Sequence, residues 1–214
     1  MKMLLFLLIL LGTVVGASMY IKQNPIKLNL SLTQPLKPNN NVSVTPQISA
    51  SASPISCSRT PIVDVTEGPY YKQGSPERNT ISDATITGTS ILLSGLVLDE
   101  NCNPIANAWL DFWQADAGGN YDNQGFKLRG HQYTDTSGRY IVSTVIPGEY
   151  PGRTPHIHVK VRPFENGPVT TTQLFIPNAE KNTSDTLYDD SLLVSISDGP
   201  EGKTATYNFV IRTR

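Results

Sequence analysis

The sequence is poor in several residue types on which common protein classes depend. It has only 2 cysteines and 3 histidines in 214 residues, and it contains no heptad pattern and no internal repeat. The net charge of -1 gives no electrostatic reason to expect a nucleic-acid partner. Charged residues make up 16%, below the usual share of about 25%, whereas Gly and Pro, at 16 each, are typical of a loop-rich β protein.

The longest apolar run lies at the N-terminus. Residues 1–21 carry Lys2, then an uninterrupted apolar stretch, then small residues up to Ala17. This pattern predicts a secretory signal peptide cut after Ala17, or an N-terminal membrane anchor, since about 20 apolar residues span a bilayer. In either case we expect an exported protein, whether secreted, periplasmic or tethered at the cell surface, with no other membrane contact.

A change of composition divides the remainder. Residues 22–56 are rich in Asn, Pro, Ser, Thr and Gln and poor in aromatics, which predicts a flexible, disordered linker. Residues 57–214 would then form the folded domain. Apolar alternation there predicts short strands at 90–98, 108–113, 139–145, 156–161, 169–176 and 204–211, with at most a short helix near 178–190. We therefore expect an all-β fold, a β-sandwich of mostly antiparallel strands with long loops.

The two cysteines bracket the start of this domain. Cys57 and Cys102 do not have the spacing of a zinc knuckle, and the leader implies an oxidising compartment. A disulfide between them is the prediction. The alternative is that they join the histidines around a zinc ion.

Two of the three histidines share one face of a strand. In His156-Ile157-His158-Val159-Lys160-Val161, the apolar residues face one way and the histidines the other. Imidazoles at positions i and i+2 can reach a single metal ion, and imidazole suits zinc, copper, iron or nickel. The alternative is a polar face that points to water.

Four motifs together resemble the intradiol ring-cleavage dioxygenases. They are W-x-A-x-x-x-G-x-Y ending at Tyr121, P-G-x-Y-P around Tyr150, R-x-x-H-I-H from Arg153 to His158, and T-Q-L-F at 172–175. The segment at 66–71, Thr-Glu-Gly-Pro-Tyr-Tyr, is similar to that of exported, single-domain members. The resemblance extends over residues 57–175 and implies the same sandwich fold.

The resemblance also implies roles for individual residues. One non-haem iron(III) ion per chain would be held by two phenolates and two imidazoles, from Tyr121, Tyr150, His156 and His158. Tyr150 would be the displaceable axial ligand, with His158 opposite it. Residues beside the substrate would be Arg153 and Gln173, and the segment lining its pocket would be Gly68, Pro69 and Tyr70. An alternative for Arg153 is a surface salt bridge, and His131 is expected on a loop, solvated or near the ligands.

The implied activity is cleavage of a catechol-type ring between its two hydroxylated carbons. O2 is the co-substrate, and the product is a cis,cis-muconate type dicarboxylate. Gly152 stands where some family members have an aromatic residue, so we expect an open pocket that accepts several catechols. Two other hypotheses remain from the sequence, namely an exported, non-enzymatic β-sandwich binding or adhesion module, and a zinc or copper protein that uses only the histidine pair.

Overall fold

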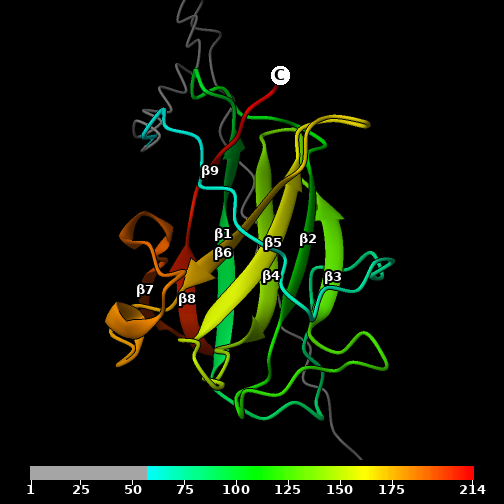
Figure 1. Ribbon diagram of the computed structural model, residues 1–214. Helices are drawn as coiled ribbons and strands as arrows, with labels where there is room; N and C mark the ends of the chain where they lie inside the picture. The colour runs from blue at the N-terminus through cyan, green and yellow to red at the C-terminus, as the bar shows by residue number, and fades with distance from the viewer. Residues whose placement is uncertain (1–56) are drawn as a thin grey trace, which may run out of the picture. The chain divides into compact units, whose positions relative to one another are not determined.

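Two stacked β-sheets form the folded part of the chain (Figure 1). The computed structural model describes residues 57–214, so the predicted leader and linker lie outside the described residues. One sheet contains, in spatial order, β4 (Arg139–Val145), β1 (Ser90–Leu98), β8 (Gly202–Thr206) and β7 (Ser195–Gly199), and β9 (Phe209–Val210) also pairs with β1. The other contains β3 (Arg129–Tyr133), β2 (Trp109–Gln114), β5 (His156–Arg162) and β6 (Thr170–Phe175).

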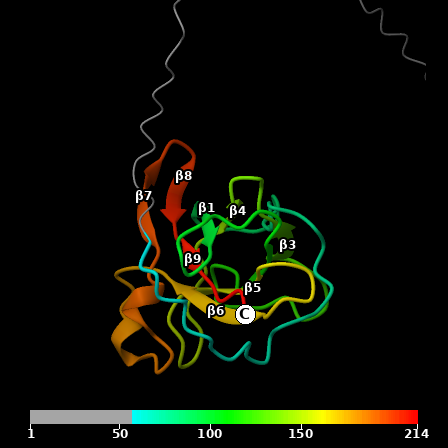
Figure 2. The same ribbon diagram turned by 90° about the horizontal axis from the view of Figure 1, so that it is seen from above.

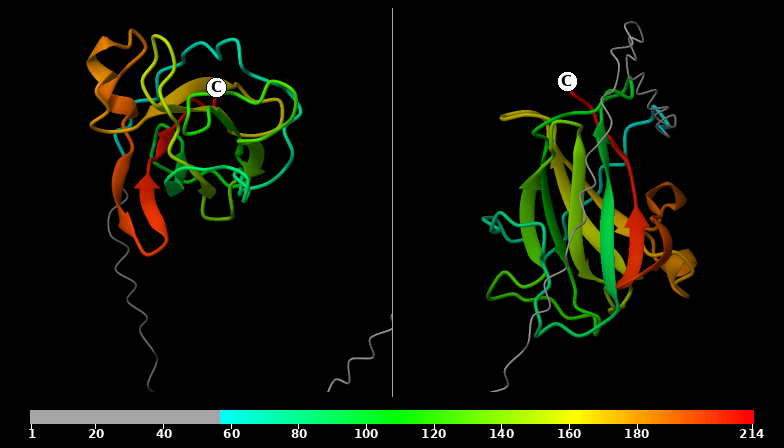
Figure 3. Two further views of the ribbon diagram at one scale, coloured as in Figure 1. Left: turned by 90° about the horizontal axis from the view of Figure 1, so that it is seen from below. Right: turned by 180° about the vertical axis from the view of Figure 1, so that it is seen from behind.

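The arrangement confirms the predicted β-sandwich. The two layers are seen end-on in Figure 2, and from behind β4, β1 and β8 lie side by side (Figure 3). Strand pairs are antiparallel except those of β1 with β8 and β9. Between β6 and β7 lie two 3₁₀ turns, η1 (Asn182–Ser184) and η2 (Asp190–Leu192), in place of the expected short helix. Within residues 57–214 no helix is long and apolar enough to cross a membrane.

The core lies between the sheets and is built by alternation along each strand. Leu93 of β1 and Phe112 of β2 are completely buried, and the inward side chains of β5 are Ile157, Val159 and Val161, as predicted. Burying one such side chain contributes about 1.5 to 3 kcal/mol. Since β5 lies between β2 and β6, its other face is held on a strand that is paired along both edges.

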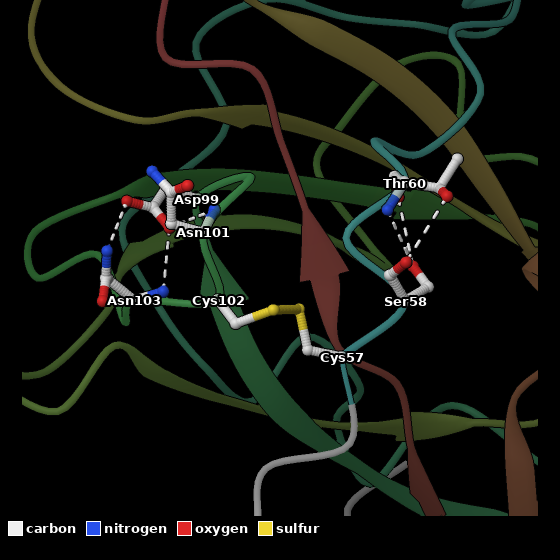
Figure 4. Close-up of a disulfide and its surroundings, with 7 residues drawn as sticks. All are labelled: Cys57, Ser58, Thr60, Asp99, Asn101, Cys102 and Asn103. Atoms are coloured by element: carbon white, nitrogen blue, oxygen red, sulfur yellow. Dashed lines mark hydrogen bonds between the residues drawn. A yellow bond between two sulfur atoms is a disulfide. The ribbon is translucent and has the colours of Figure 1, made fainter.

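The predicted disulfide between Cys57 and Cys102 is present (Figure 4). Cys102 lies in the turn after β1, where the Asp99 carboxylate accepts the backbone N–H groups of Asn101 and Asn103, each over 2.8 Å. Because both sulfurs are bonded to each other, the alternative of cysteine ligands on zinc is wrong.

The segment after Cys57 crosses the outer face of the β3-β2-β5-β6 sheet. Val65 donates its backbone N–H to Thr171 on β6, and Arg78 donates to His131 on β3, over 2.7 and 2.8 Å. This segment covers the sheet face on which the two histidines of β5 lie.

Candidate metal centre

The two histidines of β5 are buried, so the alternative of a solvated polar face is wrong. His156 and His158 are 2% and 1% exposed. Trp113 of β2 is the register partner of His158 and stacks on its ring, with centroids 4.7 Å apart and planes 7° apart. The strand therefore presents both imidazoles to a covered site.

The two tyrosines reach the same place from separate loops. Tyr121 follows β2, and Tyr150 lies between β4 and β5. The Tyr150 hydroxyl lies 3.3 Å from His156 Nε2, which lies 3.1 Å from His158 Nε2. The Tyr121 and Tyr150 rings are 5.7 Å apart at 80°, and Tyr121 is 6.4 Å from the His158 ring. The structure thus brings the four predicted ligands together.

Interlocked loops bring the tyrosines together. A Cβ added to Gly119 would lie 2.1 Å from the carbonyl oxygen of Glu149, so the loop before Tyr121 packs directly on the residue before Tyr150. Asp116 supports this loop by accepting the backbone N–H groups of residues 118 and 120. This is a turn role, which is common for an aspartate in a glycine-rich loop.

Hydrogen bonding and burial set the protonation of the imidazoles. His156 Nδ1 lies 2.6 Å from the Thr154 carbonyl oxygen, an acceptor only, so Nδ1 carries the proton and Nε2 keeps a free lone pair. Burial, and then the nearby Arg153 cation, lower the pKa of His156 to about 4. Burial and then His156 lower the pKa of His158 well below its usual value. At neutral pH both rings are neutral, the form in which imidazole binds a metal.

The phenols remain protonated without a cation. Burial raises the pKa of Tyr121 and of Tyr150. The Tyr121 hydroxyl is buried without a hydrogen-bond partner in the part of the chain that the structure describes. Leaving such a group unsatisfied costs about 1 to 3 kcal/mol. A hard cation among the four donors would satisfy it and would favour the phenolates, so the residues present fit an iron(III) ion.

Arg153 and Gln173 lie beside this cluster. Arg153 Nη1 donates to the Tyr150 hydroxyl over 3.2 Å, and Nη2 donates to Gln173 Oε1. Gln173 is 1% exposed on β6, where its register partner is His158. Arg153 also forms an ion pair with Asp185, Nε to Oδ2 at 2.9 Å, but the Asp185 side chain is completely buried. The alternative of a surface salt bridge is therefore wrong.

The Gly68-Pro69-Tyr70 segment lies against the ligands. The Tyr70 ring stacks on that of Tyr121, with centroids 4.3 Å apart and planes 10° apart, and meets the Tyr150 ring edge-on at 6.0 Å. Gly68 has φ +71°, and a Cβ there would contact His158. Pro69 and Tyr70 also line a surface hollow, together with Tyr71, Lys72, Asn123 and Arg129.

His131 corrects the sequence-based expectation. It lies on β3 and not on a loop, and its Nδ1 is 2.7 Å from the carbonyl oxygen of Ser75. Asp111, its register partner on β2, accepts a hydrogen bond from Ser75 Oγ over 2.7 Å. Sequence reasoning missed β3 because Arg129-Gly130-His131-Gln132-Tyr133 has no apolar alternation.

Sequence reasoning also missed the residues that support the ligands. The sequence marks Trp113 only as part of a motif, and none of the family motifs contains Asn182 or Asp185 or gives Thr154 a role. Thr154 Oγ1 donates to Asn182 Oδ1 over 2.6 Å, and both are buried. The one signal for Trp113 was its place in an alternating strand. Asp185 lies 32 positions from Arg153, and no local pattern marks it.

The donor set itself is unusual. Within residues 57–214 no group of three or more His, Cys, Asp or Glu side chains is arranged to hold a metal ion. The cluster consists instead of two phenols and two imidazoles. Fold and site together define a β-sandwich with a Tyr₂His₂ donor cluster.

Comparison with known proteins places this class of structure in a family. The family model described as Dioxygenase matches residues 66–212. The chain is 32% identical over 117 residues to the protocatechuate 3,4-dioxygenase beta chain of Burkholderia cepacia, covering 47% of this chain and 50% of that one. It is 34% identical over 92 residues to catechol 1,2-dioxygenase 2 of Acinetobacter lwoffii, covering 39% and 34%. The chain thus spans half or less of the length of these two curated relatives.

Solved structures give the same result. The dioxygenase domain of a dioxygenase and carbohydrate-binding protein fusion from Streptomyces sp. SirexAA-E is 42% identical, with a TM-score of 0.69, covering 72% of this chain and 100% of that one. For 3-chlorocatechol 1,2-dioxygenase from Rhodococcus opacus 1CP the identity is 27% and the TM-score 0.66, covering 72% and 73%. The chain belongs to the intradiol ring-cleavage dioxygenase family, whose members typically use non-haem iron(III) and act on a catecholic substrate with O2.

Proposed function

We propose that the protein is an iron(III)-dependent intradiol dioxygenase. It cleaves a catechol-type ring between the two hydroxylated carbons with O2 and yields a cis,cis-muconate type dicarboxylate. The observation that carries this proposal is the convergence of Tyr121, Tyr150, His156 and His158, with His156 Nε2 within 3.3 Å of the Tyr150 hydroxyl and 3.1 Å of His158 Nε2. These four residues would hold one iron per chain.

The metal and the side chains around it would have different roles in the reaction. Iron(III), when bound, would supply the charge that ionises the phenols and activates a chelated catechol towards O2. With the metal bound, the Tyr150 oxygen would be a phenolate, so it could take a catechol proton and become the hydroxyl to which Arg153 Nη1 donates over 3.2 Å. Arg153, with Gln173 at its other nitrogen, would stabilise negative charge on the substrate ring.

The residues that line the pocket would decide which substituted catechols can enter it. Gly68, Pro69 and Tyr70 would bound the ring on one side. Gly152, which is exposed in the turn between Tyr150 and Arg153, has φ +77°, and a Cβ built there would meet nothing within 4 Å. This open space supports a pocket that accepts several substituted catechols.

Export and domain organisation belong to the same proposal. Residues 57–214 would form the dioxygenase domain, which agrees with the family match at 66–212. The apolar segment 1–21 and the disulfide are what an exported protein would carry, whether secreted, periplasmic or tethered to the cell surface.

Oxygen uptake by the iron-loaded full chain tests the proposal. A small panel of catechols should give O2 consumption and a dicarboxylate product in equal amounts. Tyr121→Phe or His158→Ala should abolish both. Tyr133→Phe is the matched control, because that tyrosine is 47% exposed. A folded, iron-loaded protein that consumes no O2 with any catechol would contradict the proposal.

A further inference from the structure

A buried carboxylate, that of Asp185, is paired with Arg153 and is neither a candidate metal ligand nor a substrate-lining residue. Asp185 immediately follows η1, and its side chain is completely buried. Burial alone would raise its pKa, but hydrogen bonds from the backbone of Leu187 and Thr154 and from Arg153 lower it. Asp185 is therefore a buried anion, and buried anions persist only where they are paired and hydrogen-bonded.

The Asp185 carboxylate accepts hydrogen bonds from Arg153 and from two backbone N–H groups. Oδ2 accepts from Arg153 Nε over 2.9 Å and from the Thr154 backbone N–H over 2.9 Å, while Oδ1 accepts from the Leu187 N–H over 2.9 Å. Both oxygens are thereby fixed by backbone groups, and the position of the carboxylate does not depend on Arg153. Asp185 is a rigid anchor for the arginine.

The geometry of guanidinium makes this anchor directional. Its donors lie in one plane, so fixing Nε leaves Nη1 and Nη2 pointing along set directions. In the structure these two nitrogens donate to the Tyr150 hydroxyl and to Gln173 Oε1. Without Asp185, a side chain that is still 17% exposed could turn towards solvent.

We infer that Asp185 is a positioning residue, which aims the Arg153 guanidinium at the Tyr150 hydroxyl. The inference rests on the proposed dioxygenase function. Among the residues that the structure describes, Arg153 is the only side chain that donates a hydrogen bond to the Asp185 carboxylate, and none of the four ligands does, so the direct route from Asp185 to the site runs through Arg153.

A double-mutant cycle tests this inference. Asp185→Asn keeps the size of the side chain, and we expect kcat to fall by about 10- to 100-fold, as for removal of other groups that orient a metal site. Arg153→Gln should lower kcat at least as much. If Asp185 acts through Arg153, the double variant should be no slower than Arg153→Gln alone, because the two losses are coupled. Losses that multiply would overturn the inference.

A spectroscopic readout separates positioning from general support of the fold. A phenolate that has lost a donated hydrogen bond gives up electron density more readily. The phenolate-to-iron charge-transfer band should therefore move to longer wavelength in Asp185→Asn and in Arg153→Gln, with no further shift in the double variant. An unshifted band in Asp185→Asn would overturn the inference.

Controls keep the outcomes distinct. Asp198→Asn makes the same charge change at an exposed ion pair with Lys203 and should alter neither kcat nor the band. If Asp185→Asn does not fold, Asp185→Glu replaces it in the same cycle. No O2 uptake by the wild-type protein would refute the proposed function, whereas full activity in Asp185→Asn beside an active wild type would refute this inference alone.

Discussion

The Nε2 atoms of His156 and His158 lie 3.1 Å apart inside the protein. His156 Nδ1 is occupied by the Thr154 carbonyl oxygen, so its free lone pair faces its neighbour. Two buried imidazoles held in this way cannot both be charged, since like charges at such a distance repel strongly. The site therefore favours the neutral form of both imidazoles, which is the form that binds a metal.

This preference makes stability depend on pH. The pKa of His156 is lowered to about 4 by burial and by Arg153, whereas in the unfolded chain it is about 6.5. Between these values the unfolded chain binds more protons, so the free energy of unfolding of the metal-free protein should fall as the pH drops from 6.5 to 4. The expected loss is about 3 kcal/mol from His156 alone.

Urea unfolding of the metal-free protein at several pH values measures this loss. His156→Gln should remove its own share of the dependence between pH 6.5 and 4, and the share that comes from His158, whose pKa is also lowered, should remain. A wild-type free energy of unfolding that stays level across this window would contradict the assigned burial and tautomer.

Substitution of Gly119 by alanine tests how the two tyrosine-bearing loops are held together. Its φ is +81°, and a Cβ there would lie 2.1 Å from the Glu149 carbonyl oxygen, whereas Gly74, at φ +83°, has nothing within 4 Å. Alanine at Gly74 carries only the backbone cost, about 1 to 2 kcal/mol. Gly119→Ala should cost more and should also reduce the iron bound per chain, because it separates Tyr121 from Tyr150. Thermal unfolding and metal analysis of the two variants should differ clearly, and equal behaviour would show that the loop contact is unimportant.

The disulfide should stabilise the domain without taking part in the reaction. It closes a sequence separation of 45 residues. Restricting a loop of this length in the unfolded chain contributes about 4 kcal/mol. The double variant Cys57→Ser/Cys102→Ser should therefore unfold about 10 °C lower, while its O2 uptake at 25 °C stays within about twofold. An unchanged melting temperature would mean that the bridge does not form in solution.

The strands that could be predicted from the sequence are those in which apolar and polar side chains alternate. The expected strands at 90–98 and 139–145 coincide with β1 and β4, and β5 begins at His156 as predicted. The predicted strand at 204–211 is instead two strands, β8 and β9, which pair with successive parts of β1. β7, with the sequence Ser-Ile-Ser-Asp-Gly, was missed because it is an edge strand with little apolar content.

The candidate site, like the fold, could be predicted only in part from the sequence. Its four candidate ligands were found because family motifs carry them, and the strand pattern places only the two histidines on one face. The support for Arg153 comes from Asp185, and that for Thr154 from Asn182, on a turn that is remote along the chain. Contacts of this kind follow from how β6 and the turns after it pack beside β5, which alternation along one strand cannot express.

The most direct test of the central claim is the visible absorption spectrum of the full chain loaded with one iron(III). We expect a broad phenolate-to-iron charge-transfer band that weakens in Tyr121→Phe and in Tyr150→Phe and disappears when both are replaced, with Tyr133→Phe unchanged. A protein that binds one iron(III) per chain and remains colourless would contradict the account, because neither phenol could then be a ligand.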